Sequence, residues 1–136
     1  MNETPTDTPR ALIVDDEPSI RNAIRRWLTS HGFDADTASN GVEALDLFNK
    51  NTYDIVTMDL DMPRMDGRET IRELRSVAPG LPIIMITGYL DRVDDTLLQS
   101  VSRVLLKPIS LRHIEQEIRE VLGCPVAQPH PGDHAR

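Results

Sequence analysis

The sequence predicts an α/β domain in which a doubly wound, parallel, five-stranded sheet carries helices on both faces. Short apolar runs alternate with helix-length amphipathic segments, as in parallel strands joined by right-handed crossover helices. Polar residues stand just past four of these runs: Asp15 and Asp16, Asp59, Thr87, and Lys107. Chemistry in an open α/β sheet lies outside the carboxyl ends of the strands, so we expect these five side chains to share one crevice.

The sequence of the first part of the domain predicts a strand, a helix and an edge strand. The strand is residues 11–14, and the helix begins at Pro18, because proline suits the first helical turn. One face of this helix is apolar and is formed by Ile20, Ala23, Ile24, Trp27 and Leu28. The helix ends near His31-Gly32, where glycine can form the cap, and residues 33–37 alternate with period two, as in an edge strand.

A second helix, a strand and a third helix follow. Asn40 caps the second helix, and the strand covers residues 53–58. The apolar face of the second helix is formed by Val42, Leu45 and Phe48. The third helix opens at Asp66-Gly67, with Asp66 as its N-cap, and stops at Pro79-Gly80. Its apolar face is formed by Ile71, Leu74 and Ala78.

The last part of the chain predicts two strands and two helices. The strands are residues 82–86 and 104–106, and residues 90–100 between them form a short, charged helix. The final helix is capped by Ser110 and closes at Gly123. Its residues expected to face the sheet are Leu111, Ile114, Ile118, Val121 and Leu122. Those expected to face water are Arg112, Glu115, Glu117 and Arg119.

Length and composition set the domain organisation. The 136 residues suffice for one domain with a real core. We expect a disordered arm at residues 1–9, the folded domain at residues 10–123, and a disordered, proline-rich tail at residues 124–136. Met1 and the complete arm favour a natural start of the chain.

Charge and cysteine content exclude several classes of protein. A net charge of −7 opposes direct nucleic-acid binding, which needs clustered Lys and Arg. Cys124 is the only cysteine, so an internal disulfide framework and a CxxC metal site are excluded. No run approaches the roughly 18 apolar residues that a membrane span needs. We therefore expect a cytoplasmic protein that binds neither nucleic acid nor membrane.

The strand-end residues predict a phosphoryl site. Three carboxylates brought together repel each other, and a divalent cation would relieve that repulsion. Hard oxygen ligands favour Mg²⁺, with Mn²⁺ also possible. Lys107 offers a point charge for a phosphoryl oxygen, and the Thr87 hydroxyl offers a hydrogen bond. Asp59 in such surroundings is arranged to be phosphorylated.

Four motifs resemble those of the receiver domain of two-component response regulators. They occupy residues 14–18, 58–67, 87–89 and 106–108, in the order found in that family. The resemblance covers about residues 10 to 122. It implies a flavodoxin-like (βα)5 fold with strand order 2-1-3-4-5 and a phosphoprotein that acts in signal transduction or a phosphorelay.

The resemblance implies a role for each acidic residue. Asp59 matches the phosphoacceptor, which takes a phosphoryl group from a histidine kinase or a histidine phosphotransfer protein. Asp16 matches the direct Mg²⁺ ligand, and Asp15 matches its acidic neighbour, which often acts through water. Asp61 stands where the family uses a backbone carbonyl as a metal ligand.

The resemblance also covers the residues that respond to phosphorylation. Thr87 and Lys107 match the residues that sense and hold the phosphoryl group, and Pro108 matches the proline whose preceding peptide bond is usually cis. Val104 stands where the family often has an aromatic side chain that swings inward. Valine is stiff at χ1, so it cannot report phosphorylation by the same rotamer change.

Two further departures concern the surroundings of the site. The interval of 20 residues from Thr87 to Lys107 is shorter than is typical of the family, which predicts a short, displaced or mobile fourth helix and an atypical output surface. Tyr89 and Asp61 lie where the family tunes the lifetime of the phosphoryl group. Tyr89 could shield that group from water, and the Asp61 carboxylate could add charge or bind near the metal.

We expect a stand-alone, single-domain receiver, monomeric or weakly dimeric. It would signal to an unknown downstream protein by contact or phosphorelay, and its only chemistry would be self-phosphorylation and autodephosphorylation. The alternatives are a phosphorylation-independent pseudo-receiver, or a receiver fragment of a larger hybrid kinase or transcriptional regulator. A haloacid dehalogenase-type phosphohydrolase, suggested by residues 59–62, is disfavoured because that family places this motif on its first strand.

Overall fold

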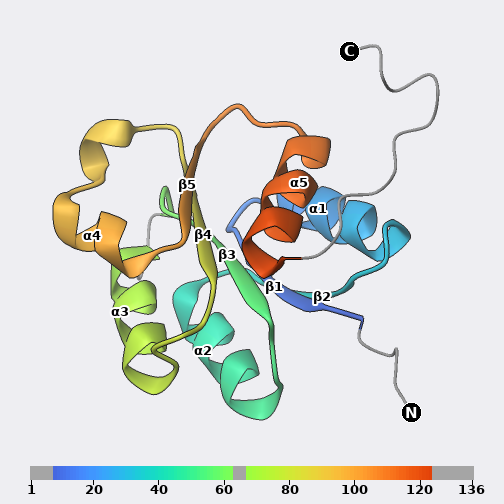
Figure 1. The fold of residues 1–136 in the computed structure, drawn as a ribbon, viewed down its shortest axis with the longest axis horizontal. Helices are drawn as coiled ribbons and strands as arrows, with labels where there is room; N and C mark the ends of the chain where they lie inside the picture. Colours follow the sequence, from blue (N-terminus) through green and yellow to red (C-terminus); the bar gives the residue numbers. More distant parts are fainter. Residues whose placement is uncertain (1–7, 63–66, 124–136) are drawn as a thin grey trace.

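The computed structural model describes residues 8–62 and 67–123, which form a five-stranded parallel sheet with helices on both faces (Figure 1). The strands are β1 (Arg10–Val14), β2 (Asp34–Ala38), β3 (Ile55–Asp59), β4 (Ile83–Thr87) and β5 (Arg103–Leu106). The helices are α1 (Pro18–Ser30), α2 (Gly41–Lys50), α3 (Gly67–Val77), α4 (Asp95–Ser100) and α5 (Leu111–Leu122), with a 3₁₀ turn, η1 (Leu90–Arg92), before α4. The predicted fold class is confirmed.

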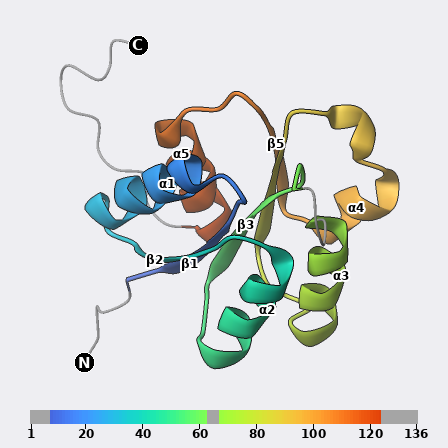
Figure 2. The ribbon, with the colours of Figure 1, turned by 180° about the vertical axis from the view of Figure 1, so that it is seen from behind.

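The strand order is β2-β1-β3-β4-β5, and all four pairs are parallel. Helices α1 and α5 cover one face of the sheet, and α2, α3 and α4 cover the other (Figures 1 and 2). This is the flavodoxin-like order, which reverses direction between β1 and β3. A crevice therefore opens at the carboxyl ends of these two strands.

Two separate cores lie on the two faces of the sheet, because successive side chains of a strand point in opposite directions. Leu12 and Val14 of β1 belong to the core under α2, α3 and α4. Ala11 and Ile13 belong to the core under α1 and α5. Burial on both faces explains why the central strands read as continuous apolar runs.

Strands β3 and β4 extend one residue past their apolar runs. Asp59 and Thr87 are the last residues of these strands, whereas the sequence predicted that each residue would come just after its strand. The ladder continues through both positions, since Asp59 pairs with Ile86 and Thr87 pairs with Leu106. Backbone pairing, which polarity does not interrupt, holds both functional candidates on rigid strands.

Two predicted core residues are exposed. Ile20 of α1 is 43% exposed and Val42 of α2 is 67% exposed, so their assignment to buried helix faces was wrong. Both lie in the first turn of a helix that starts beyond the carboxyl end of a strand. In α2 the buried face begins with Gly41 and Ala44 instead of Val42. Leu28 and Ala44, further along the same helices, are buried.

The predicted solvent-facing residue Glu115 of α5 is 7% exposed. Its Oε1 accepts a hydrogen bond from Trp27 Nε1 of α1 at 2.9 Å, and its Oε2 pairs with Arg119 Nε at 2.8 Å. Burial alone would raise the pKa of Glu115, but these two partners outweigh it and hold the pKa below its ordinary value. Trp27, predicted in the core, is only partly buried and packs against it.

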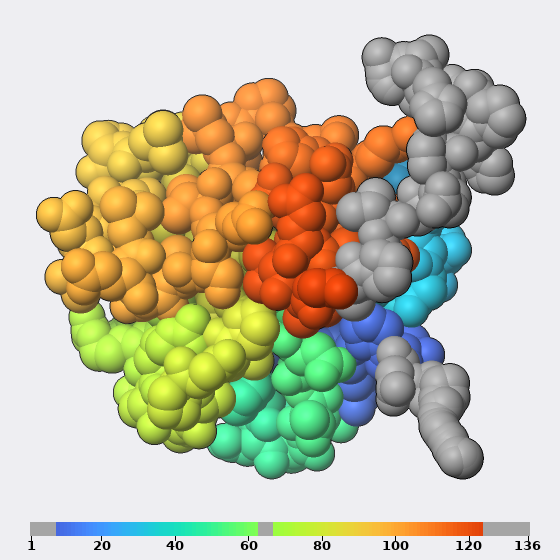
Figure 3. Space-filling model, viewed as in Figure 1, coloured from blue at the N-terminus to red at the C-terminus, as the bar shows by residue number. Residues whose placement is uncertain are grey.

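The segment predicted as one helix at residues 90–100 divides into η1 and α4. The division falls at Asp94, whose carboxylate accepts a hydrogen bond from the Leu97 N–H and so starts a new helix. Helix α4 has six residues, which confirms the predicted short fourth helix. Although α4 and α5 lie on opposite faces of the sheet, both are visible on the side of the molecule that Figure 3 shows.

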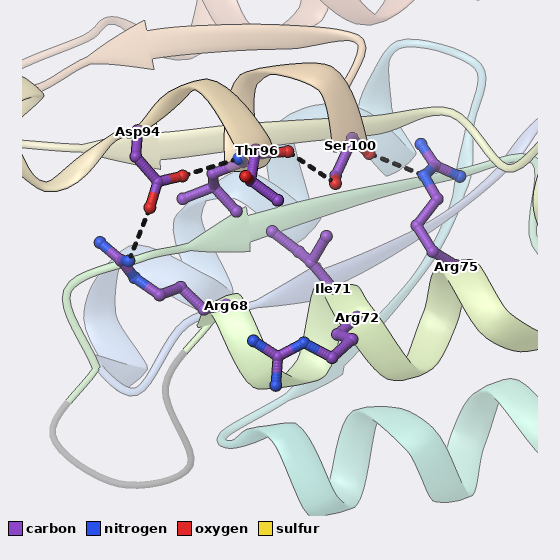
Figure 4. Close-up of a pocket in the computed structure, with 8 residues that line it drawn as sticks. Arg68, Ile71, Arg72, Arg75, Asp94, Thr96 and Ser100 are labelled. Carbon is purple, nitrogen blue, oxygen red and sulfur yellow. Dashed lines mark hydrogen bonds and ion pairs between the residues drawn. The ribbon is translucent and has the colours of Figure 1, made fainter.

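Two arginines of α3 hold α4 at its two ends (Figure 4). Arg68 donates to the Arg92 carbonyl and pairs with Asp94, with 3.6 Å between Nη1 and Oδ2. Arg75 Nε donates to the Ser100 carbonyl at 2.7 Å. A cavity of about 180 Å³ lies between the two helices. Among its lining residues Asp94 is the one carboxylate, so it is not the predicted acidic site.

Several other predictions concern the chain ends and the backbone. Gly123 caps α5 in the left-handed region, with φ 73°, and the Lys107-Pro108 peptide bond is cis, as expected. The proposed N-cap Asp66, residues 1–7 of the predicted arm and the predicted tail at 124–136 lie outside the described residues. Within the described ranges, every helix is too short or too polar to cross a lipid bilayer.

Candidate functional site

The five predicted site residues lie together at the carboxyl edge of the sheet. Asp15 and Asp16 follow β1, Asp59 ends β3, Thr87 ends β4 and Lys107 follows β5. Backbone hydrogen bonds tie two of these positions to neighbouring strands: the Asp15 N–H donates to the Ala38 carbonyl of β2, and the Lys107 N–H donates to the Thr87 carbonyl of β4. The sheet therefore sets the spacing of the side chains.

Three carboxylates form a cluster with the geometry of a metal site. One oxygen from each of Asp15, Asp16 and Asp59 lies within 4.8 Å of the others. Asp15 and Asp59 are buried and Asp16 is exposed. An all-oxygen donor set that opens to solvent on one side suits a hard divalent cation that keeps some of its water.

The electrostatics of Asp15 support the same conclusion. The pKa of Asp15 is raised to about 6. Burial is the main cause and the neighbouring Asp59 and Asp16 charges add to it, while the Glu17 N–H and Lys107 act in the opposite direction. The Glu17 N–H donates to Asp15 Oδ1 at 2.9 Å. The described protein groups thus leave this cluster short of positive charge, and a divalent cation would supply it.

Lys107 provides the cation of the site. Its Nζ lies 2.9 Å from Asp59 Oδ1 and 3.3 Å from Asp61 Oδ2. Burial would lower the pKa of Lys107, but these two carboxylates outweigh it and raise the pKa above its ordinary value. Lys107 is therefore charged at neutral pH and spans the gap between the two aspartates.

The Asp61 carboxylate is placed at the centre of the site, and the sequence interpretation missed its contacts. Asp61 Oδ1 accepts a hydrogen bond from the Thr87 hydroxyl at 2.8 Å, and Oδ2 accepts from the Gly88 N–H at 2.9 Å. Burial opposes ionisation, but the Gly88 and Thr87 hydrogen bonds and Lys107 hold the pKa of Asp61 below its ordinary value. The sequence predicted its backbone carbonyl as a metal ligand and a carboxylate that adds charge or binds near the metal, but not the contacts with Thr87 and Gly88.

Tyr89 and Arg92 line the outer side of the site. The Tyr89 N–H donates to Thr87 Oγ1 at 3.0 Å, while its ring lies exposed beneath the Arg92 guanidinium, 4.6 Å from guanidinium carbon to ring centroid. Arg92 Nη1 also lies 3.7 Å from Asp61 Oδ1. Arg92 was not predicted; a basic residue in a short segment that follows Thr87 was the available signal.

Val104 lies on β5, away from the acidic cluster. It is partly buried, packs against the core under α2, α3 and α4, and pairs in register with Met85 of β4. A branched side chain fixed in this way leaves the site without the aromatic rotamer change described above. The described contacts of Thr87 run instead to Asp61 and to Tyr89.

Comparison with known proteins accounts for this arrangement. A family model described as the response regulator receiver domain matches residues 11–119. The chain belongs to this family. Its receiver domain is similar to the response regulator MprA of Mycobacterium sp. strain KMS, with 38% identity over 116 residues that cover 83% of this chain and 50% of that relative. The chain spans about half the length of such relatives.

Solved receiver structures agree with the fold. The response regulator protein TrrA of Thermotoga maritima, solved in complex with Mg²⁺-BeF, is 32% identical, with a TM-score of 0.76 over 83% of this chain and 98% of that one. A CheY-like receiver domain protein of Methanospirillum hungatei is 27% identical, with a TM-score of 0.80 over 86% of this chain and 95% of that one. Receiver domains act in two-component signalling, and the acidic cluster of this one could bind a metal.

Proposed function

We propose that Asp59 accepts a phosphoryl group in a reaction that requires Mg²⁺. The observation that carries this proposal is that the buried Asp59 belongs to the carboxylate cluster and also lies 2.9 Å from the Lys107 ammonium. A carboxylate beside both a metal site and a fixed cation is set to attack a phosphoryl group, and the two positive charges would stabilise that group.

Asp15, Asp16, Asp59 and the Asp61 backbone carbonyl would hold Mg²⁺, with Mn²⁺ as a substitute. The bound cation would supply positive charge to the phosphoryl oxygens. An Asp59 carboxylate oxygen attacks phosphorus while the phosphorus–nitrogen bond of the donor phosphohistidine breaks, and the imidazole leaves with the electron pair. Lys107 stays close to the new acyl phosphate and balances its charge.

The donor in this proposal is a histidine kinase or a histidine phosphotransfer protein, as for the family. The domain acts alone, as a monomer or weak dimer, and passes its signal to an unidentified downstream protein by contact or by phosphorelay. It is not an enzyme beyond its own phosphorylation and dephosphorylation. A receiver that forms part of a longer regulator is the alternative, favoured by the half-length match to MprA. The cytoplasmic location stays a prediction.

Intact-mass measurement with Mg²⁺ and acetyl phosphate tests the proposal. The unchanged chain should gain one phosphoryl group, and Asp59→Asn should gain none. The matched control is Asp46→Asn, which removes an exposed carboxylate of α2 that pairs only with Lys50 among the described residues, and it should behave as the unchanged chain. A native fold with no adduct would favour the phosphorylation-independent pseudo-receiver, and turnover of a phosphomonoester would favour a phosphohydrolase.

A further inference from the structure

The Asp61 carboxylate binds the same side chains, Thr87 and Lys107, that are expected to bind the phosphoryl group. Its two oxygens take the Thr87 hydroxyl at 2.8 Å, the Gly88 N–H at 2.9 Å and the Lys107 ammonium at 3.3 Å. Asp61 is held there from its own backbone, because its N–H donates to Asp59 Oδ1 at 2.9 Å. A two-oxygen anion thus occupies a set of donors suited to phosphoryl oxygens.

Two of the three donors, the Thr87 hydroxyl and the Gly88 amide, cannot bind a second anion while they donate to Asp61. A threonine hydroxyl has one proton, and that of Thr87 is donated to Asp61. The Gly88 amide also has a single proton, donated to the same carboxylate. Lys107 has three, of which Asp59 and Asp61 take two. A second anion can share Lys107, but it can take Thr87 and Gly88 only after Asp61 has left.

Charge acts in the same direction. A phosphoryl group on Asp59 would carry about two negative charges beside the Asp61 carboxylate, and like charges at this separation repel. Arg92 offers the carboxylate another partner, since its half-exposed guanidinium lies 3.7 Å from Asp61 Oδ1. Movement toward Arg92 would release Thr87 and Gly88 together.

We propose that Asp61 is a built-in anion that holds the phosphoryl-binding groups in the unphosphorylated chain and must be displaced before a phosphoryl group can bind them. This inference rests on the proposed function. Asp61 acts here as a positioning residue: it orders Thr87, Gly88 and Lys107 around an anion, and it lowers the affinity of the site for any competing anion. The side chain does this, separately from the backbone carbonyl assigned to the metal.

Calorimetric titration with beryllofluoride, a phosphoryl analogue, in excess Mg²⁺ tests the inference on the full chain. Removing a competing charge-assisted hydrogen-bond acceptor should tighten binding about tenfold in both Asp61→Asn and Asp61→Ala. Asp91→Asn is the charge-matched control, because this exposed carboxylate of η1 belongs to the same connection and makes no hydrogen bond or ion pair with residues 8–62 or 67–123. It should change the affinity by less than about twofold.

Titration with Mg²⁺ alone supplies a second readout. Loss of a negative charge near the acidic cluster can only weaken or leave unchanged the binding of a cation. Tighter beryllofluoride binding combined with equal or weaker Mg²⁺ binding therefore cannot come from an improved metal site. Amide spectra of each variant confirm the fold, and the Gly88 amide signal should shift in both Asp61 variants before any analogue is added.

The possible outcomes separate the inference from the proposed function. If the unchanged chain binds beryllofluoride and both Asp61 variants bind it equally or more weakly, the inference fails and the proposed function stands. An equal gain in Asp91→Asn would also overturn it, because the effect would then be general charge. Binding by Asp61→Asn but not by the unchanged chain would support the inference. Absence of binding in every folded variant would overturn both.

Discussion

Asp15 and Glu115 are carboxylates with nearly equal exposure, 6% and 7%, and their pKa values shift in opposite directions. Glu115, in the contact between α1 and α5, has two strong donors, Arg119 and Trp27, and its pKa falls. Asp15, at the carboxyl edge of the sheet, has one backbone donor and two acidic neighbours, and its pKa rises to about 6. The exposure of the two carboxylates is similar, but Asp15 lies deeper in the protein and has fewer donors.

The comparison separates a structural carboxylate from a functional one. A buried charge whose donors are all supplied by the protein contributes to holding two helices together. A buried charge left without enough positive partners lowers stability and favours any ligand that supplies them. Lys107 lowers the pKa of Asp15 but does not offset its burial, because the direct contacts of the ammonium are with Asp59 and Asp61.

Removal of Lys107 should have the largest effect on the acidic site. Lys107→Ala takes away the fixed cation beside Asp59, so the rate of phosphorylation by acetyl phosphate should fall about a hundredfold, as when one charge-stabilising donor is lost. Lys50→Ala, at an exposed lysine of α2, is the control and should leave the rate unchanged. A fall of less than about threefold in Lys107→Ala would show that the metal alone provides the positive charge.

Removal of Glu115 from its contacts with Trp27 and Arg119 should lower the stability of the fold. Glu115→Ala leaves Trp27 Nε1 and the Arg119 guanidinium without their acceptor and should lower the free energy of unfolding by about 2–3 kcal/mol. Gln116→Ala, at the next and exposed position of α5, should change it by less than about 0.5 kcal/mol. Urea denaturation measures both, and equal effects would mean that the Glu115 contacts are not stabilising.

Neutralisation of Asp15 in the acidic cluster should instead increase the stability of the metal-free domain. The pKa of Asp15 is higher in the folded chain than its ordinary value of 3.8, so the folded chain binds more protons between about pH 4 and pH 6. Stability of the metal-free domain therefore falls as the pH rises through that window. Asp15→Asn should raise the free energy of unfolding by about 1 kcal/mol at pH 7 and not at pH 4. A destabilised variant at pH 7 would contradict the comparison.

The sequence was sufficient to predict the fold and the members of the acidic cluster. Parallel strands must bring their carboxyl ends to one edge, so residues that end apolar runs, such as Asp59 and Thr87, could be placed together without coordinates. The predicted helix pattern at α5 succeeded for Ile114 and Ile118, which are buried, for the same reason: regular spacing determines the face.

The sequence was not sufficient where contacts depend on loops or on distant polar partners. Apolar periodicity assigned Glu115 to water, because nothing in the periodicity shows that Trp27, 88 residues away, needs an acceptor. The contacts of Asp61 with Thr87 and Gly88 depend on how two connections bend after β3 and β4. Such local backbone paths are weakly encoded by residue type. The division at Asp94 within the predicted 90–100 helix did carry a sequence signal, because Asp is a favoured N-cap residue.

Calorimetric titration of the unchanged chain with Mg²⁺ at pH 7 and pH 5 tests most directly whether the cluster of Asp15, Asp16 and Asp59 is a cation site. A proton on Asp15 competes with the metal, so a pKa of about 6 predicts binding at pH 7 and an affinity about tenfold lower at pH 5. In Asp15→Asn the affinity should be weaker at pH 7 and nearly independent of pH. Absence of Mg²⁺ binding at pH 7, or the same affinity at both pH values in the unchanged chain, would contradict the account.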